Sequence, residues 1–431
     1  MKEIIKISKT SNCNYLAKII KLKNLRKHKN ADRLQIATID FQDVVTGLEA
    51  KNGDLYCYFP VECQINKDFL SFTNSFRHPE LNKDKKQKGF FGDNGRVKAV
   101  KLRGEKSMGY IVPVEQLEGF TKRSFKDFVG KEFDTVDETL IVNKYRKKIK
   151  QKQGNSKQSK KPRISRLVEG QVKLHVSTEN LRKNAFKIEP NDYITITYKT
   201  HGTSWWAGNL LVKKKLNIFL KLFRFIGLPI KDTEYDYVYG SRNVVKNEYE
   251  TRHKEHFYKE DLWGEIKDEL KEFIPKGFTF YGECLGYTKS GRSIQGEYDY
   301  SCEEGQKRIQ VYRITFTNAD GIAHELSSRQ TKELCDKFEL EYVYLFYQGK
   351  AKDLYDIDVS EHWQRNFVEE LVKQYNDKNC FMCKNKVPEE GIVLRKESLY
   401  KFEAYKLKSF KFLEMETKNL DKNIPDMEED N

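Results

Sequence analysis

The chain has 431 residues, of which 38% are apolar and 13% aromatic, so it is long enough to bury the cores of two or three domains. Its 79 Lys and Arg against 64 Asp and Glu give a net charge of +15, which predicts a polyanionic partner. The longest apolar stretch, 216–230, contains Lys221 and Arg224 and is too short and too charged to span a bilayer.

Residues 1–10 contain no apolar run and no cleavage site of the kind found in secretory signals. The eight cysteines are spread along the chain, which is typical of reduced thiols rather than of a disulfide framework. We therefore expect a protein of the cytoplasm or nucleus that is not secreted.

Residues 1–143 contain short β-segments separated by turn signals such as Asn52-Gly53. The expected strands are 15–21, 34–39, 44–46, 54–59 and 96–102. Strands with polar connections and no long helix predict a small β-barrel.

The next segment, 144–166, holds 11 Lys or Arg and no Asp or Glu, and it is poor in apolar residues. This composition predicts a flexible basic linker. The linker is either a solvated connector or an arm that binds a phosphate backbone, and the sequence leaves both interpretations open.

Residues 167–416 mix strands with helices, which indicates an α+β domain. We expect strands at 193–198, 205–212, 279–281, 311–316 and 392–395, and helices at 259–273, 327–338 and 361–375. The polar stretch 417–431 ends in Glu-Glu-Asp-Asn and predicts a disordered acidic tail.

Residues suited to chemistry occur at strand ends in this second domain. Lys199 ends a predicted strand and is followed by His201 and Gly202, and a glycine there allows a tight turn or a close approach to a ligand. The motifs that follow in chain order are Arg242, Gly282-Glu283, Glu390-Gly391 and Lys406-Leu407-Lys408. The alternation of the last motif places both ammonium groups on one face of a strand.

This ordered set, over about residues 170–413, resembles the covalent nucleotidyltransferase superfamily of polynucleotide ligases and mRNA capping enzymes. The form Lys-x-His-Gly-Thr at Lys199 is similar to RNA ligases. Upstream, the segment 28–34 (His-Lys-Asn-Ala-Asp-Arg-Leu) resembles a strand of OB-type tRNA-binding modules. The segment 95–107 resembles the N-terminal domain of the RNA ligases typified by the Deinococcus and Naegleria enzymes.

The resemblance implies an OB-like barrel over 1–143 and a nucleotidyltransferase domain over 167–416, built of two antiparallel sheets flanked by helices with ATP in the cleft between them. It implies an ATP-dependent RNA ligase in which Lys199 forms a lysyl-AMP, with Mg²⁺ or Mn²⁺ as cofactor. AMP then passes to an RNA 5′-phosphate, and a 3′-hydroxyl displaces it. We expect RNA nick or break repair, with RNA or an RNA-containing duplex as partner, a monomer and no membrane.

The same resemblance implies a role for individual residues. Glu283 resembles the carboxylate that accepts from the ribose hydroxyl, and Glu390 the one that holds Mg²⁺ through water. Arg242 resembles the arginine that contacts ribose or substrate phosphate, and Tyr312 the aromatic stacked on adenine. The implied ATP-binding set is completed by His201, Gly202, Lys406 and Lys408. Two features depart from the family pattern, namely Tyr198 where many relatives have Glu, and the insert-like segment 216–229.

Nucleophilic attack by Lys199 requires a neutral amine. A free lysine has a pKa near 10.4, so roughly one in 2,500 is neutral at pH 7. Nearby cations and burial lower a lysine pKa, and we expect Lys406, Lys408 and the metal to act in this way. A drop of about three units corresponds to roughly 4 kcal/mol.

Alternative functions remain open from the sequence. DNA ligases and capping guanylyltransferases usually carry their OB domain after the last lysine motif, and only 23 residues (431 − 408) follow Lys408, which disfavours both. A non-catalytic RNA-binding protein with a decayed ligase fold is the other alternative, although every charged motif position is retained.

Two smaller motifs also have alternatives. Cys380 and Cys383 supply either two zinc ligands, where a structural site usually needs four, or a pair of buried thiols. In the N-terminal domain, several cations and aromatics fit either a basic, base-stacking surface or a barrel core with solvated lysines. These residues are Arg26, Lys27, Lys29, Arg33, Tyr56, Tyr58 and Phe59.

Overall fold

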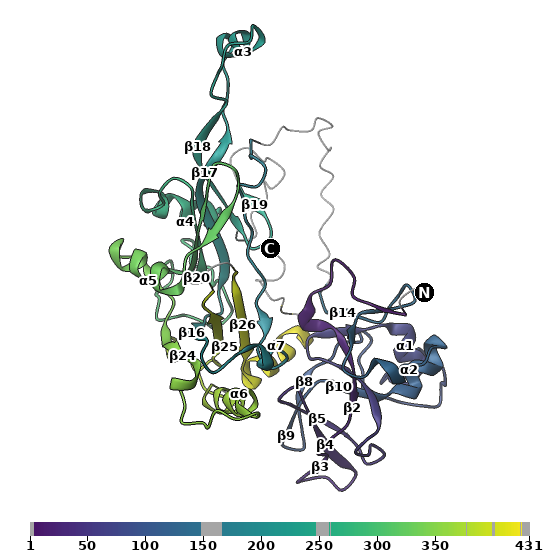
Figure 1. Cartoon of the computed structure of the whole chain (residues 1–431). Helices are drawn as coiled ribbons and strands as arrows, with labels where there is room; N and C mark the ends of the chain where they lie inside the picture. The colour runs from purple at the N-terminus through teal and green to yellow at the C-terminus, as the bar shows by residue number, and fades with distance from the viewer. Residues whose placement is uncertain are drawn as a thin grey trace.

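The computed structural model describes residues 4–147, 166–246, 258, 260–375, 377–398, 401–422 and 424. Most of the predicted linker and the last residues of the predicted tail lie outside this range. The described residues form an N-terminal part, 4–147, and a C-terminal part, 166–424 (Figure 1). The architecture is mixed α and β and rich in sheets.

Short strands dominate the N-terminal part. They are β1 (Ile5–Lys6), β2 (Ala17–Lys21), β3 (Arg26–Lys27), β4 (Leu34–Ile39), β5 (Gln42–Gly47), β6 (Leu55–Phe59), β7 (Cys63–Ile65), β8 (Ala99–Leu102), β9 (Glu105–Met108), β10 (Tyr110–Pro113), β11 (Glu132–Phe133), β12 (Thr135–Val136), β13 (Thr139–Leu140) and β14 (Val142–Lys144). Two short helices, α1 (Lys67–Phe72) and α2 (Val114–Thr121), pack beside them. The fully buried side chains of Phe59, Phe69 and Leu117 lie in their common core.

The C-terminal part contains two large sheets. The seven-stranded sheet comprises β17 (Thr203–Lys213), β18 (Thr233–Ser241), β19 (Val245–Lys246), β20 (Phe278–Gly286), β21 (Lys307–Thr317), β22 (Ala323–Glu325) and β23 (Glu341–Tyr342). The five-stranded sheet comprises β15 (Glu179–Asn180), β16 (Tyr193–Lys199), β24 (Leu345–Lys350), β25 (Gly391–Lys396) and β26 (Glu403–Lys408). Apart from the short β15 and β23, the strands pair in antiparallel fashion.

Helices cover these sheets. Helix α4 (Leu262–Leu270) packs on the seven-stranded sheet, where the Nε1 of Trp263 donates to the carbonyl of Ser204 at 3.0 Å. Helix α5 (Ser328–Lys337) lies against β21, and α6 (Trp363–Gln374) buries Trp363 and Phe367 against the five-stranded sheet. Each of these helices therefore covers part of an outer face of a sheet.

One short loop joins the two sheets. Strand β16 of the five-stranded sheet ends at Lys199, and β17 of the seven-stranded sheet begins at Thr203. The segment 200–202 between them carries the predicted Lys-x-His-Gly motif from one sheet to the other. Lys199 is thus placed where the two sheets meet.

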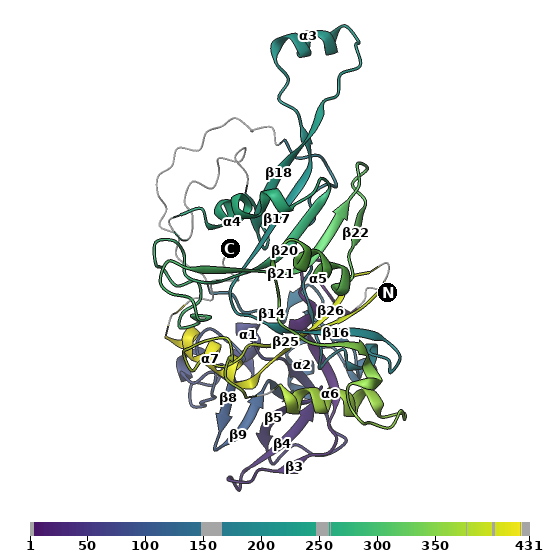
Figure 2. The ribbon, with the colours of Figure 1, turned by 90° about the vertical axis from the view of Figure 1, so that its left-hand side faces the viewer.

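The insert-like segment 216–229 projects from the molecule. Helix α3 (Ile218–Phe225) stands beyond the end of the β17–β18 hairpin (Figures 1 and 2). Ile218, Phe219 and Phe225 are exposed there. Among the described residues, no helix is long and apolar enough to cross a membrane.

Helix α7 (Phe410–Asp421) connects the two parts. Phe410 and Leu413 pack with Val61, Ala99 and Met108 of the N-terminal part. The buried Arg96 donates from Nη2 to the carbonyl of Thr417 at 3.0 Å and to Asp421 Oδ1 at 2.6 Å. The prediction of a disordered tail from 417 is therefore wrong for 417–421, because contacts with the other part hold this polar turn in the helix.

We expect Phe410→Ala to lower the free energy of unfolding by about 3–5 kcal/mol, because a fully buried ring at this junction would leave a cavity. Urea denaturation followed by circular dichroism measures the change. The matched control is Phe186→Ala, whose ring is 67% exposed and whose loss should change stability by no more than about 0.5 kcal/mol. Equal effects of the two substitutions would show that α7 does not anchor the N-terminal part.

Candidate active site

The side chain of Lys199 forms an ion pair in a mostly buried position. Its Nζ lies 2.6 Å from Oε1 of Glu390, and the side chains are 16% and 1% exposed. Glu390 directly precedes β25, which pairs with β16 so that Gly391 lies opposite Lys199. The pairing of these two strands therefore brings the carboxylate to the amine.

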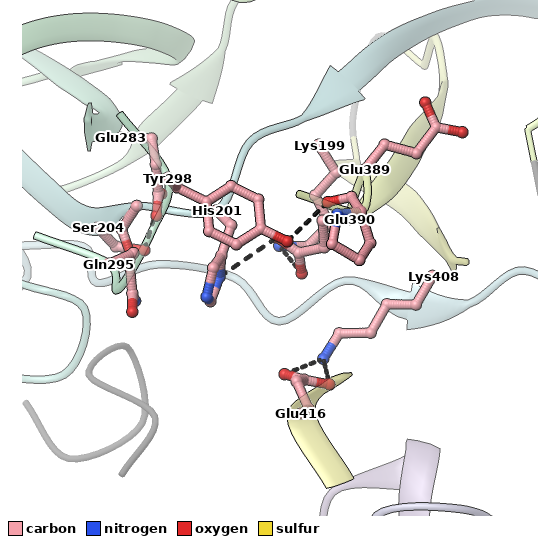
Figure 3. Close-up of polar contacts among 12 residues, drawn as sticks. Lys199, His201, Ser204, Glu283, Gln295, Tyr298, Glu389, Glu390, Lys408 and Glu416 are labelled. Carbon is pink, nitrogen blue, oxygen red and sulfur yellow. Dashed lines mark hydrogen bonds and ion pairs between the residues drawn. The ribbon is translucent and has the colours of Figure 1, made fainter. Parts of the chain in front are cut away.

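The loop after Lys199 is held close to the neighbouring sheet. A Cβ atom on Gly202 would lie 2.3 Å from the carbonyl oxygen of Cys284, so only glycine fits. His201 donates its backbone N–H to the hydroxyl of Tyr300 at 2.6 Å, and its Nδ1 lies 3.8 Å from Oε2 of Glu390. Figure 3 shows Lys199, His201 and Glu390 converging.

Glu283 lies on the opposite sheet from Lys199. Strands β17 and β20 pair so that Ser204 faces Glu283, and the Ser204 hydroxyl donates to Oε2 of Glu283 at 3.2 Å. Glu283 is only 7% exposed. Sequence reasoning did not identify Ser204, although its place directly after the Lys-x-His-Gly-Thr motif was a signal.

A cavity between the two sheets brings four predicted residues together. Lys199, Arg242, Glu283 and Tyr312 all line it, and its empty space is about 880 Å³, including the portion open to solvent. The hydroxyl of Tyr312 lies 2.5 Å from Nδ1 of His175, which lines the same cavity. A side chain from each of several strands thus faces one space that opens to solvent.

Tyr198 packs at the edge of this cavity. Its ring makes edge contacts with Phe346 and Phe381, and its side chain is almost completely buried. Burial raises the pKa of its hydroxyl, with a further contribution from Cys380. Where many relatives have a carboxylate, this chain therefore has a neutral aromatic group.

The two adjacent carboxylates differ in their surroundings. Glu390 faces Lys199, whereas Glu389 points away from it (Figure 3), and burial raises the pKa of Glu389 to about 7. Among the described residues, Oε2 of Glu390 has no hydrogen-bond donor. A buried carboxylate oxygen of this kind is a suitable ligand for a hard divalent cation.

Such an ion would find few other protein ligands. Across the ranges that the structure describes, no three His, Cys, Asp or Glu side chains lie close enough to hold a metal. Mg²⁺ commonly keeps several waters and takes further ligands from substrate phosphates. Glu390 fits this mode of binding.

Lys406 and Lys408 occupy one face of β26, but their surroundings differ. Burial and the neighbouring Lys408 lower the pKa of Lys406 to about 8, with a smaller contribution from Lys199. Burial acts in the same direction on Lys408, but Glu416 and Glu62 outweigh it and hold its pKa well above the usual value. The Nζ of Lys408 lies 3.0 Å from Glu62 and 3.2 Å from Glu416.

The structure does not bring every predicted residue into the cavity. His201, Gly202, Glu390, Lys406 and Lys408 are not among its lining residues. Lys408 turns towards α7 and away from Lys199 (Figure 3). Its two carboxylate partners, Glu62 and Glu416, were not predicted, because neither belongs to a motif. Glu62 is 346 residues away in the chain, and Glu416 is 8 residues away, on α7.

Cys380 lies in the same buried cluster as Tyr198, and Cys383 packs against that cluster. A hydrogen bond between the two thiols lowers the pKa of Cys380 and raises that of Cys383. Both cysteines are free thiols. In the described part of the chain they supply at most two ligands of a zinc site.

A family model and several solved structures match this chain. A family model described as RNA ligase matches residues 192–413, which is 222 (413 − 192 + 1) of the 431 residues. No curated protein matches the chain.

Among solved structures, a mutant of a Naegleria gruberi RNA ligase with AMP and Mn is similar to this chain with a TM-score of 0.56 and 17% identity, over 93% of this chain and 98% of the other. A different mutant of that ligase, with ATP and Mn, gives a TM-score of 0.57 over the same shares at 17% identity. The Naegleria gruberi ligase with PPi gives a TM-score of 0.57 at 17% identity, over 94% of this chain and 99% of the other. At this identity, the likeness shows the fold.

We expect the amine of Lys406 to titrate at about pH 8 instead of near 10.4. The fraction of Lys406 that an amine-selective reagent modifies in a short pulse, measured by peptide mass spectrometry across pH, should therefore have its midpoint at about 8. Lys408→Met should move this midpoint upwards, because it removes the cation that lowers the pKa of Lys406 most. A wild-type midpoint near 10.4 would show that burial does not disfavour the ammonium.

Proposed function

The chain belongs to the RNA ligase family, and from this premise we propose that it joins the 5′-phosphate and 3′-hydroxyl ends of RNA with ATP, through a covalent Lys199–AMP. The main support for the proposal is the position of Lys199, which is mostly buried between the two sheets. Lys199 lines a cavity between two sheets together with Arg242 and Glu283, and its amine faces a buried carboxylate. A surface lysine would have none of these neighbours.

The reaction has three steps. The neutral amine of Lys199 attacks the α-phosphorus of ATP, a P–N bond forms, and pyrophosphate leaves. An oxygen of the RNA 5′-phosphate then attacks the same phosphorus, breaks the P–N bond and takes AMP. Finally, the 3′-hydroxyl attacks the 5′-phosphate, loses its proton and displaces AMP. Covalent catalysis divides one difficult transfer into easier steps.

The ion pair with Glu390 holds Lys199 in the attacking position but also favours its protonated form. Loss of the proton therefore requires that the carboxylate be neutralised by another positive charge. Glu390 would hold a divalent cation through its second carboxylate oxygen, and that ion would supply such a charge and would offset charge on the phosphates. Lys406, whose pKa is already lowered, adds positive charge on the same sheet when it is protonated.

Residues on the other sheet have binding roles in this proposal. Glu283 accepts from a ribose hydroxyl, and Ser204 fixes the orientation of its carboxylate. Arg242 contacts ribose or a phosphate, and Tyr312 stacks on adenine from its position in the cavity. His201 and Gly202 shape the loop that presents Lys199, with the carbonyl of Gly202 accepting from the Gln295 side chain.

The domain organisation supports the same proposal. We assign residues 1–143 to an OB-type domain that binds nucleic acid, and 167–416 to the nucleotidyltransferase domain. The alternation of short strands and the segment 28–34 support the first assignment. We further propose that the protein is a monomer that uses Mg²⁺ or Mn²⁺ and repairs nicks or breaks in RNA or RNA-containing duplexes.

Incubation with ATP labelled at the α-phosphate, followed by denaturing electrophoresis, tests the chemistry. We expect covalent label on the wild type with Mg²⁺ or Mn²⁺ and none on Lys199→Ala, because the nucleophile is gone. The control Lys213→Ala changes an exposed lysine at the end of β17 and should be labelled like the wild type.

Labelling from GTP but not from ATP would indicate a guanylyltransferase. A chain that ATP never labels, but that still binds RNA, would indicate a non-catalytic RNA-binding protein. Either result contradicts the proposal.

A further inference from the structure

A second hollow, larger than the cavity at Lys199, lies between the two parts. It has about 2260 Å³ of empty space, including the portion open to solvent. Its walls come from residues 144–147 at the end of β14 and just after it, from the loop 292–298, and from α7 with the residues that follow it. We call this hollow the interdomain groove.

The groove is lined mainly by positive charge. Its cations are Arg96, Lys144, Arg146, Lys147, Arg292 and Lys422, against three acids, Glu62, Glu297 and Glu416. Two of these acids, Glu62 and Glu416, are paired with Lys408, which is not itself a lining residue. The single charge of Lys408 offsets only part of theirs, and Asp421, which is not a lining residue either, offsets Arg96. Six cations against three acids leave a surplus of three positive charges (6 − 3) along the groove, which suits a phosphate backbone.

The inner end of the groove reaches the nucleophile. His201 lines the groove, whereas Lys199 lines the cavity between the two sheets, which we call the nucleotide cavity because we propose that ATP binds there. Glu390 lies between them, with one oxygen 2.6 Å from the Lys199 amine and the other 3.8 Å from His201. A chain of phosphates lying in the groove would thus end beside the phosphorus that Lys199 carries after reaction with ATP.

We propose that the interdomain groove binds the RNA strand whose 5′-phosphate accepts AMP, an inference that rests on the function proposed above. A terminal phosphate oxygen attacks the phosphorus of Lys199–AMP, the P–N bond breaks, and the departing amine takes up a proton. The strand leaves with a 5′-to-5′ pyrophosphate bond to adenosine. The cations on both walls hold the phosphates behind this terminus.

The rival occupant of the groove is the pyrophosphate portion of ATP, which has the same chemistry as an RNA phosphate. The groove is larger than the nucleotide cavity, about 2260 against 880 Å³, and two phosphates would occupy little of it. Three cations of the segment 144–147 line one wall, and Lys422 after α7 lines another. Both the size of the groove and the spread of its cations favour a longer polyanion.

The test variant removes one cation from each wall, in the double substitution Arg146→Gln and Lys422→Gln. Both residues are exposed, so the fold should persist, and thermal denaturation checks this. The matched control is Lys86→Gln with Lys88→Gln, which removes two exposed lysines that do not line the groove.

Fluorescence anisotropy with a single-stranded, 5′-phosphorylated RNA labelled at its 3′ end measures affinity across salt concentrations. We expect weaker binding by the test variant and a slope of log K against log salt that is smaller by about 1.4, since each single-strand phosphate contact contributes about 0.7. With enzyme already carrying AMP, transfer to subsaturating RNA should slow by the same factor as the affinity falls. The control should match the wild type in both assays.

An unchanged salt slope would overturn the assignment of RNA to the groove. Loss of Lys199 labelling by ATP in the test variant would also overturn it, because the cations would then serve the triphosphate. A wild-type chain that ATP does not label contradicts the proposed function instead, and the salt slope still decides separately whether RNA lies in the groove.

Discussion

The ion pair between Lys199 and Glu390 is the interaction on which the site depends. Both groups are removed from most solvent, so each would carry a large desolvation cost alone. Removal of one partner from such a buried pair typically costs 3–5 kcal/mol, because the other charge is left uncompensated. The pair therefore holds the amine at the boundary of the two sheets.

The sheets place this pair through their hydrogen-bond register. Gly391 pairs with Lys199 on one side and with Lys408 on the other, so the three strands β16, β25 and β26 align the charged residues in one row. A Cβ on Gly391 would lie 1.9 Å from the carbonyl of Leu407, so no larger residue fits. Lys408 forms ion pairs with Glu62 and Glu416. Because Glu62 belongs to the N-terminal part, the first of these pairs links the two parts of the chain.

Much of the site could be predicted from the sequence, because its residues occur at strand ends in a fixed order. The predicted strand 193–198 ends one residue before Lys199, and the structure places Lys199, Arg242, Glu283 and Tyr312 around one cavity. The family was also predicted correctly. Each motif is a short run of residues that can be recognised in the sequence by itself. Because the strands that carry the motifs pair with one another, the motif residues come close together in space.

The rest depends on contacts between segments far apart in the chain. The interaction of Glu62 with Lys408 spans 346 residues, and nothing near Glu62 in the sequence indicates it. The helical end of α7 follows from its contact with Arg96, while its polar composition alone predicts disorder.

The central claim is that Lys199 is the residue that carries AMP. Proteolysis and tandem mass spectrometry, after incubation of the whole chain with ATP and Mg²⁺, locate the adduct on a single side chain. We predict AMP on the Nζ of Lys199 and on no other residue. AMP found on a different side chain would contradict the account.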